Sequence, residues 1–218
     1  MAPSLRASSL GRLVSRVLPA LAPLALVLSL AAPLPKDAGA APADSPRDTL
    51  SGESALWSVT AFGGVHDDSR LWEILTFRGH DFESSYLAGV AVTREVGASF
   101  DRLTWELEGS LFRHFGNQSH LEGNLALLAR WRRFPWDSFV DTSVALGQGI
   151  SVAAERPEIE RPDAQEVLHY TAVEAEFAPP SDSRWSVVGR IHHRSGVFGL
   201  YGTRGGSNFH TLGVRLHF

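Results

Sequence analysis

The chain has 218 residues and a formal net charge of −4, with 20 lysine and arginine residues against 24 aspartate and glutamate residues. This balance excludes the strongly basic surface of a nucleic-acid-binding protein, so we expect no nucleic-acid partner. Cysteine is absent, which excludes disulfides, thiol catalysis and cysteine-based metal sites.

The N-terminal segment has the three parts of a secretory signal peptide. Arginines precede an apolar run from Val17 to Leu34, and small residues follow around Ala40. A transmembrane anchor is the alternative, but prolines interrupt the apolar run. We predict three parts: a signal peptide at residues 1–40, a flexible N-terminal segment at 41–54, and a single barrel domain at 55–218.

The rest of the chain alternates between apolar and polar residues in eight segments separated by turn-forming residues. No stretch of it approaches the apolar length of a membrane helix. An even number of strands of this length is typical of an outer-membrane β-barrel, so we predict an all-β fold, an eight-stranded antiparallel transmembrane β-barrel. The predicted strands are residues 56–64, 85–95, 103–113, 120–131, 139–150, 166–177, 185–195 and 208–218.

Each predicted strand has an apolar face and a polar face. In strand 103–113, Trp105 and Leu107 share one face, while Glu106 and Glu108 share the other. An eight-stranded barrel is filled by side chains, and buried charges need partners. We therefore expect ion pairs in the lumen among Glu106, Glu108, Glu122, Glu174, Glu176, Arg130, Arg190 and Arg215. A soluble barrel of lipocalin type, with its apolar faces inward, shows the same alternation and is the alternative.

The last predicted strand favours a membrane barrel over a soluble barrel. Leu212, Val214, Leu216 and Phe218 lie on one face of strand 208–218, which ends on the aromatic residue. Closing strands of bacterial membrane barrels show apolar side chains to lipid and polar ones to the lumen. We therefore expect the protein in the outer membrane of a Gram-negative cell, after removal of the signal peptide.

Two polar residues fall on the predicted lipid face of strand 185–195. Its even positions include Arg190 and Arg194, which belong in the lumen, so His193 and Ser195 face lipid. Polar side chains facing acyl chains are costly unless they lie at the interface or serve a function. Residues two apart on one face are roughly 7 Å apart at the backbone, so an imidazole can reach a hydroxyl. His193 can then act as general base for Ser195 in the attack on an ester.

On the next strand, Asn208 has the same lipid-facing parity, and its side-chain carbonyl can orient His193. The chain resembles the outer-membrane lipid A 3-O-deacylases in three features: His193 and Ser195, the glycine-rich loop that follows them, and a last strand that ends in Phe218. These are eight-stranded barrels whose catalytic Ser, His and Glu face the membrane and cleave an ester-linked acyl chain from lipid A. The resemblance implies that Ser195 is the nucleophile and His193 the base. It puts Asn208 at the acidic position, and a neutral side chain there predicts weaker catalysis.

The resemblance also implies that the loop after the serine, beginning at Gly196, supplies oxyanion contacts. Arg194 and Arg204, near the outer rim, are candidates for contacts with lipid A phosphates. We expect no cofactor. We also expect no metal site among His192, His193, His210 and His217, because successive strand residues point to opposite faces and His192 and His193 cannot share one ion.

The sequence therefore predicts a lipid A acyl-ester hydrolase embedded in the outer membrane, with lipid A or lipopolysaccharide as its partner and a homodimer as a possible assembly. One alternative is a non-catalytic outer-membrane barrel that has a structural or partner-binding role and keeps the deacylase fold. The other is a soluble periplasmic binding barrel, which would be extracted without detergent.

Overall fold

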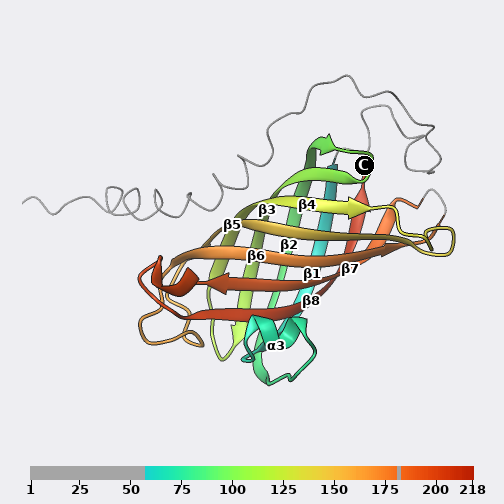
Figure 1. Cartoon of the computed structure of the whole chain (residues 1–218). Helices are drawn as coiled ribbons and strands as arrows, with labels where there is room; N and C mark the ends of the chain where they lie inside the picture. The colour runs from blue at the N-terminus through green and yellow to red at the C-terminus, as the bar shows by residue number, and fades with distance from the viewer. Residues whose placement is uncertain (1–56, 181–182) are drawn as a thin grey trace, which may run out of the picture.

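The computed structural model describes residues 57–180 and 183–218. Eight strands form one closed antiparallel barrel, in which each strand pairs with the next and β1 pairs with β8 (Figure 1). The predicted signal peptide (1–40) and N-terminal segment (41–54) lie outside the described residues. The strands are β1 (Trp57–Asp67), β2 (Phe82–Ser99), β3 (Leu103–Gly116), β4 (Leu121–Arg132), β5 (Asp141–Ala153), β6 (Val167–Ala178), β7 (Trp185–Ser195) and β8 (Gly206–His217).

The strand bounds agree with the prediction to within a few residues, and those of β7 match it at both ends. The largest difference is in the β1–β2 connection, predicted as a loop over residues 65–84. β1 continues to Asp67 and β2 begins at Phe82, because these two residues pair with each other. The connection that remains contains α3 (Leu71–Leu75), a helix of 5 residues that the sequence did not predict.

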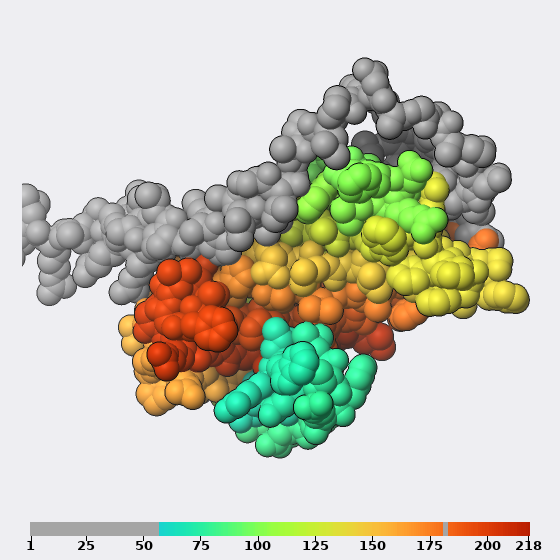
Figure 2. Space-filling view, viewed as in Figure 1, coloured from blue at the N-terminus to red at the C-terminus, as the bar shows by residue number. Residues whose placement is uncertain are grey.

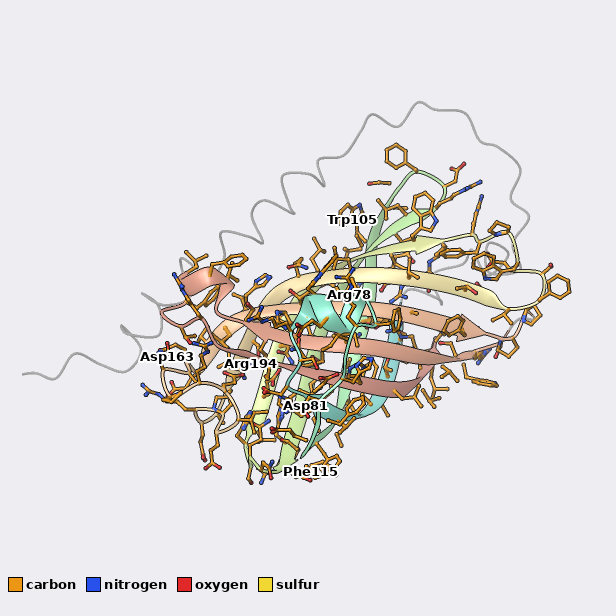
Figure 3. All side chains as sticks on the ribbon, turned by 60° about the horizontal axis from the view of Figure 1, so that its bottom comes forward. Arg78, Asp81, Trp105, Phe115, Asp163 and Arg194 are labelled. Carbon is orange, nitrogen blue, oxygen red and sulfur yellow. The ribbon has the colours of Figure 1, made fainter. Side chains whose placement is uncertain are left out.

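The two ends of the barrel carry different connections. The end that we call the loop end has the segments 68–81, 117–120, 154–166 and 196–205, of which only 117–120 is short. The opposite end, the turn end, has the segments 100–102 and 133–140. Phe115 and Trp105 mark the loop end and the turn end of β3 (Figure 3). Figure 2 shows the segment with α3 (teal) and the segment after β7 (red) as two separate protrusions.

The apolar face of each strand points away from the barrel axis. Leu107, Leu111 and Leu125 are exposed on the outer surface, whereas Glu108 and Glu174 are buried in the lumen. A lipocalin-type barrel has the opposite arrangement, so that alternative is wrong. None of the helices in the described residues is long and apolar enough to cross a membrane. An apolar outer surface around a charged lumen is the arrangement of a transmembrane β-barrel, which confirms the predicted fold class.

Ion pairs fill the lumen, as the polar faces predict. Arg130 Nε donates to Glu106 Oε1 at 2.7 Å, and Arg190 Nη2 donates to Glu108 Oε2 at 2.6 Å. Both arginines also donate to Glu174. Because each of these buried charges has an opposite partner, their mutual attraction offsets the cost of removing them from water.

Candidate functional site

His193 and Ser195 lie on the outer surface at the loop end of β7. Both side chains are partly buried, and they alternate with His192 and Arg194, which are buried in the lumen. The strand is regular up to Ser195, since its pairing with β6 and β8 continues to that residue. The period-2 geometry of the strand therefore puts the imidazole and the hydroxyl on the side that faces lipid.

A hydrogen bond fixes the orientation of His193. Its Nδ1 lies 2.7 Å from Oδ1 of Asn208, and Nδ2 of Asn208 donates to the backbone carbonyl of Ser69 at 2.8 Å. The second bond settles which way the amide is turned, because a carbonyl accepts from the amide nitrogen. The amide oxygen then accepts from His193, so Nδ1 carries the ring hydrogen and Nε2 has a free lone pair. A free Nε2 is what a general base requires.

Ser195 is held by the backbone of the following loop. Its Oγ accepts a hydrogen bond from the backbone N–H of Val197 at 3.1 Å. Among the hydrogen bonds of the described residues there is none between Ser195 and His193. Their separation is that of positions i and i+2 on one strand face, roughly 7 Å between Cα atoms, which the two side chains can bridge. Catalytic hydrogen bonds often shorten only when substrate binds.

The backbone after Ser195 has an unusual conformation. Val197 and Phe198, in η2 (Val197–Gly199), have φ angles of 45° and 55°. Neither residue is glycine, and such left-handed positions are costly for branched or bulky side chains. The segment turns so sharply that the N–H of Val197 points back at Ser195 Oγ. A strained turn that aims a backbone donor at a hydroxyl is consistent with a functional site.

Gly196 has a different role from the predicted one. Its N–H donates to the carbonyl of Gly205 at 2.9 Å. A Cβ at this position would lie 2.0 Å from the carbonyl oxygen of Thr203. Glycine is therefore required for the close approach of the two sides of the β7–β8 connection. The candidate oxyanion donor is the N–H of Val197, not that of Gly196.

Arg194 does not lie at the outer rim, so its predicted contact with lipid phosphate is wrong. Its even parity turns the side chain into the lumen, where Nε lies 3.2 Å from Glu160 Oε1 and Nη1 lies 3.5 Å from Glu122 Oε2. Burial raises the pKa of the Glu160 carboxyl, and Arg194 opposes that rise. Glu122 also accepts from Nε2 of His114 and of His192, each at 2.8 Å, in place of the arginines predicted for it. Arg204 is exposed.

Sequence reasoning placed Asn208 beside His193 but missed the rest of a row of polar residues that continues on both sides of this pair. Five outward-facing residues pair directly across five neighbouring strands, from β5 to β8 and on to β1. Within the row, Thr171 Oγ1 donates to Gln148 Oε1 at 3.3 Å, and His193 bonds to Asn208. The row is Gln148, Thr171, His193, Asn208 and Asp67. A lone polar residue of this kind is a weak signal in one sequence, because the register between strands is not visible there.

A second imidazole lies directly across from the serine. His169 on β6 is the register partner of Ser195. Its Nε2 donates to Oε1 of Gln148 at 2.6 Å, and the side chain is buried although it is on the outer face. Ser195 therefore has His193 two residues before it on its own strand and His169 opposite it on the next.

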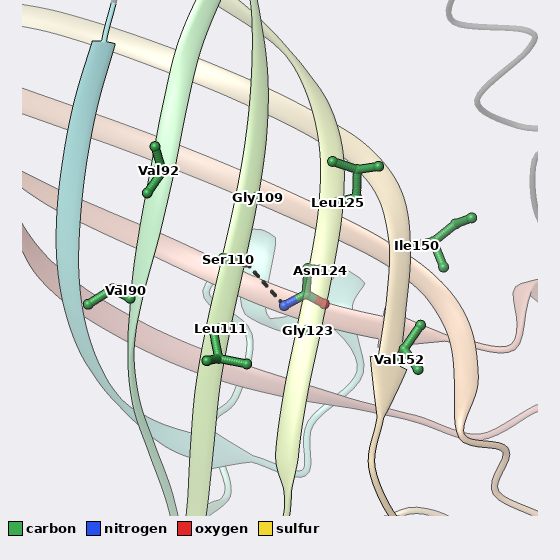
Figure 4. A pocket seen from close by; sticks show the side chains of 10 residues that line it. All are labelled: Val90, Val92, Gly109, Ser110, Leu111, Gly123, Asn124, Leu125, Ile150 and Val152. Atoms are coloured by element: carbon green, nitrogen blue, oxygen red, sulfur yellow. Dashed lines mark hydrogen bonds between the residues drawn. The ribbon is translucent and has the colours of Figure 1, made fainter.

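An apolar groove runs over the outer surface of β2 to β5. It has a volume of about 590 Å³, and its walls include Leu111, Leu125 and Ile150 (Figure 4). Its floor is open at Gly109 and Gly123, where a Cβ would meet nothing closer than 4.0 Å. The groove therefore exists because two outward-facing strand positions carry no side chain.

The groove and the serine lie on one line of paired residues. Ser195 pairs with His169, His169 with Ile150, Ile150 with Leu125, and Leu125 with Gly109. The line begins at the loop end of β7 and reaches the middle of β3, because barrel strands are tilted and staggered. Strands are ~4.8 Å apart, so the near wall of the groove is roughly 10 Å from the serine backbone.

No family model and no curated protein match the chain. Among solved structures, the outer membrane enzyme PagL is similar with a TM-score of 0.57 and 13% identity, over 74% of this chain and 99% of PagL. Neisserial surface protein A (NspA) matches with a TM-score of 0.46 and 9% identity, over 76% of this chain and 98% of that chain. The outer membrane protein OprG from Pseudomonas aeruginosa gives 0.38 and 12%, over 77% and 98%. The likeness to PagL shows that this chain has the fold of an outer-membrane barrel.

Proposed function

We propose that the protein is an outer-membrane hydrolase that cleaves an acyl ester of lipid A, with Ser195 as nucleophile, His193 as general base and Asn208 as the residue that orients His193. The observation that carries this proposal is the hydrogen-bonded pair on the lipid-facing side of β7 and β8. Asn208 Oδ1 holds Nδ1 of His193 at 2.7 Å and leaves Nε2 free on the same strand face as Ser195. A polar pair of this kind in contact with lipid is expensive to maintain without a function.

The reaction follows the chemistry of serine esterases. Ser195 Oγ attacks the ester carbonyl while Nε2 of His193 takes the hydroxyl proton. The negative charge that forms on the carbonyl oxygen is stabilised by the N–H of Val197. His193 then gives its proton to the leaving sugar oxygen, and the acyl chain stays on Ser195. Water, deprotonated by His193, hydrolyses this acyl-enzyme and restores both side chains.

The groove on β2 to β5 supports a substrate with a long acyl chain. A lipid whose ester lies at Ser195 has its chain directed into the membrane, and the paired line from Ser195 to Gly109 leads the same way. The walls of the groove are apolar and its volume is in the range of ligand sites. Lipid A reaches this side of the barrel by diffusion within the membrane, so no channel through the lumen is required.

The polar end of the substrate would lie at the loop end. Arg204, exposed in the β7–β8 connection, is a candidate for the phosphate groups of lipid A. Arg194 is not, because its guanidinium is buried beside Glu160 and Glu122.

A non-catalytic barrel is the second candidate, and the neutral side chain of Asn208 favours it. An amide can hold the imidazole but cannot balance the charge of an imidazolium as a carboxylate does. In that case the same polar row would serve to bind a lipid headgroup or a partner protein at the membrane surface.

The deciding experiment compares lipid A from cells that express the wild-type protein, Ser195→Ala or Ser99→Ala. Ser99 is at the turn end of β2, where it accepts a hydrogen bond from Nε1 of Trp105 at 2.9 Å, so its variant is the matched control away from the groove and from Ser195. We expect the wild type and Ser99→Ala to remove one acyl chain, seen by mass spectrometry, and Ser195→Ala to leave lipid A intact. Identical lipid A in all three strains, at equal levels of folded barrel, would refute the hydrolase and favour the non-catalytic role.

A further inference from the structure

We propose that Asp67, His80 and His210 form a binding site for a divalent transition-metal ion such as Zn²⁺. The three residues come from the end of β1, from the connection after α3, and from β8. Their ligand atoms all lie within 4.8 Å of one another. Asp67 and His210 are on the outer face at the loop end, so the site is outside the lumen and separate from Ser195.

The carboxylate of Asp67 is oriented before any ion binds. Its Oδ1 accepts from the backbone N–H of Ser69 at 2.9 Å and of Asp81 at 3.1 Å. This leaves Oδ2 to the two imidazoles, with His80 Nδ1 and His210 Nε2 each 2.9 Å away. The side chain of Asp67 is fully buried. A buried carboxylate with one oxygen fixed by backbone donors presents the other oxygen in a defined direction.

The two imidazoles are also held in place. The ring of His80 stacks on Phe82 at 5.5 Å and meets the ring of His210 edge-on at 5.2 Å. Phe82 in turn lies edge-on to His210 at 5.3 Å. The three rings therefore form a small aromatic cluster, and the nitrogens that face Asp67 are brought together by packing as well as by hydrogen bonds.

The donor set suits Zn²⁺. Zinc binds imidazole nitrogen and carboxylate oxygen at ~2.0–2.2 Å in tetrahedral geometry, so two ligand atoms of one ion lie roughly 3.3–3.6 Å from each other. The nitrogen-to-oxygen distances of 2.9 Å are those of hydrogen bonds, so each imidazole has to move outward by about half an ångström to admit Zn²⁺. On binding, the hydrogen on each coordinating nitrogen moves to the other ring nitrogen or to solvent, and the lone pair turns to the ion. Three protein ligands leave a position open for water or a substrate oxygen.

A second cluster of possible ligands is less suited to a metal ion. His114, His120 and Glu122 come together in the lumen, where all three are buried. Both ring nitrogens of His114 are already bonded, to Glu122 and to Gln118 at 2.8 Å each. By contrast, the side chains of His80 and His210 are 33% and 27% exposed, which gives an ion a path from solvent.

The test measures binding of Zn²⁺ to the full chain, free of any histidine tag and treated with a chelator, in detergent micelles by titration calorimetry. We expect saturable binding at one site in the wild type. His80→Ala and His210→Ala should weaken it by more than about tenfold, the smallest loss usual even for residues that only support a ligand. His120→Ala, which disrupts the lumenal cluster, should bind as the wild type does. Co²⁺ in place of Zn²⁺ should give visible absorption bands that disappear in His80→Ala.

His80 lies outside the strands, so its replacement leaves the pairing of the barrel unchanged and loss of binding cannot be ascribed to unfolding. No saturable binding to the wild type would overturn the proposal, and the cluster would then serve to hold the β1–β2 connection against β8. Binding that persists in His80→Ala, or that is lost in His120→Ala, would also overturn it. The readout does not involve hydrolysis, so it stands or falls independently of the proposed esterase.

Discussion

Replacing Asn208 by aspartate tests how the charge on His193 is balanced during the reaction. The resemblance to lipid A deacylases suggests that an acidic residue here would raise activity. A carboxylate ~4 Å from the imidazolium would stabilise it by about 4 kcal/mol at an effective dielectric constant near 20. Taken alone, this gain corresponds to a rate increase of about a thousandfold.

The structure shows two effects that oppose this gain. Asn208 Nδ2 donates to the carbonyl of Ser69 at 2.8 Å, and aspartate has no hydrogen to donate there. An unsatisfied buried group costs about 1–3 kcal/mol, and the partly buried bond to Ser69 belongs at the lower end of this range. In addition, Asn208 is the direct cross-strand partner of Asp67. Two carboxylates ~6 Å apart repel by about 3 kcal/mol under the same dielectric constant.

Both effects are present before and during the reaction, so they do not subtract from the gain directly; they favour the protonated, neutral form of the new carboxyl, which provides no charge to the imidazolium. We therefore expect Asn208→Asp to be no more active than the wild type. The assay is the initial rate of fatty-acid release from lipopolysaccharide by the purified protein in detergent, with Asn208→Ala as control. Alanine removes the acceptor that orients His193 and should lower the rate by about tenfold, the cost of one hydrogen bond at the upper end of its range. A tenfold or greater increase in Asn208→Asp would refute this reasoning, because it would mean that Asp67 does not influence the site.

Three further outcomes are expected. Gly109→Leu blocks the groove and should lower kcat/KM for long-chain esters relative to short-chain esters by an amount equivalent to about 1–3 kcal/mol. Gly63→Leu, at an open position on β1, should not change this ratio. An unchanged chain-length profile in Gly109→Leu would contradict the acyl path. Glu174→Ala leaves three buried arginines without a shared partner and should cost about 3–5 kcal/mol in the free energy of unfolding, measured by urea titration in vesicles; a loss below 1 kcal/mol would show that other glutamates suffice. Chelators should leave fatty-acid release unchanged. Zn²⁺ should slow it in the wild type and not in His210→Ala, because a bound ion makes the net charge at Asp67 positive, and Asp67 is next to Asn208 in the polar row, so the imidazolium of His193 is disfavoured.

Most of the fold could be predicted from the sequence because its signal is local. In β7, the alternation of polar and apolar residues fixes which side chains enter the lumen, and the bounds of the strand follow from the same pattern. The partners of Arg190 could be predicted as a class, since a filled lumen requires opposite charges to meet. Period-2 alternation is a property of neighbours along the chain, so one sequence is enough to show it.

The errors arose where strands end and connections begin. Arg194 obeys the alternation of β7 up to its last residues, so its side chain enters the lumen, and treating it as part of the rim was wrong. α3 has only 5 residues, too few for a helical period to stand out. His80 could not be placed because its position depends on how the β1–β2 connection folds back against β8.

The composition of the site depends on register, which is a relation between strands. Asn208 owes its place beside His193 to the pairing of β7 with β8, and Asp67 owes its place beside Asn208 to the closure of the barrel by β1 and β8. Register also joins Ser195 to Gly109 across four strand pairs. A shift of one residue at any of these pairs would turn one partner toward the lumen. The polar row thus forms only in the closed barrel, where its members bond to one another and the cost of placing them against lipid is reduced.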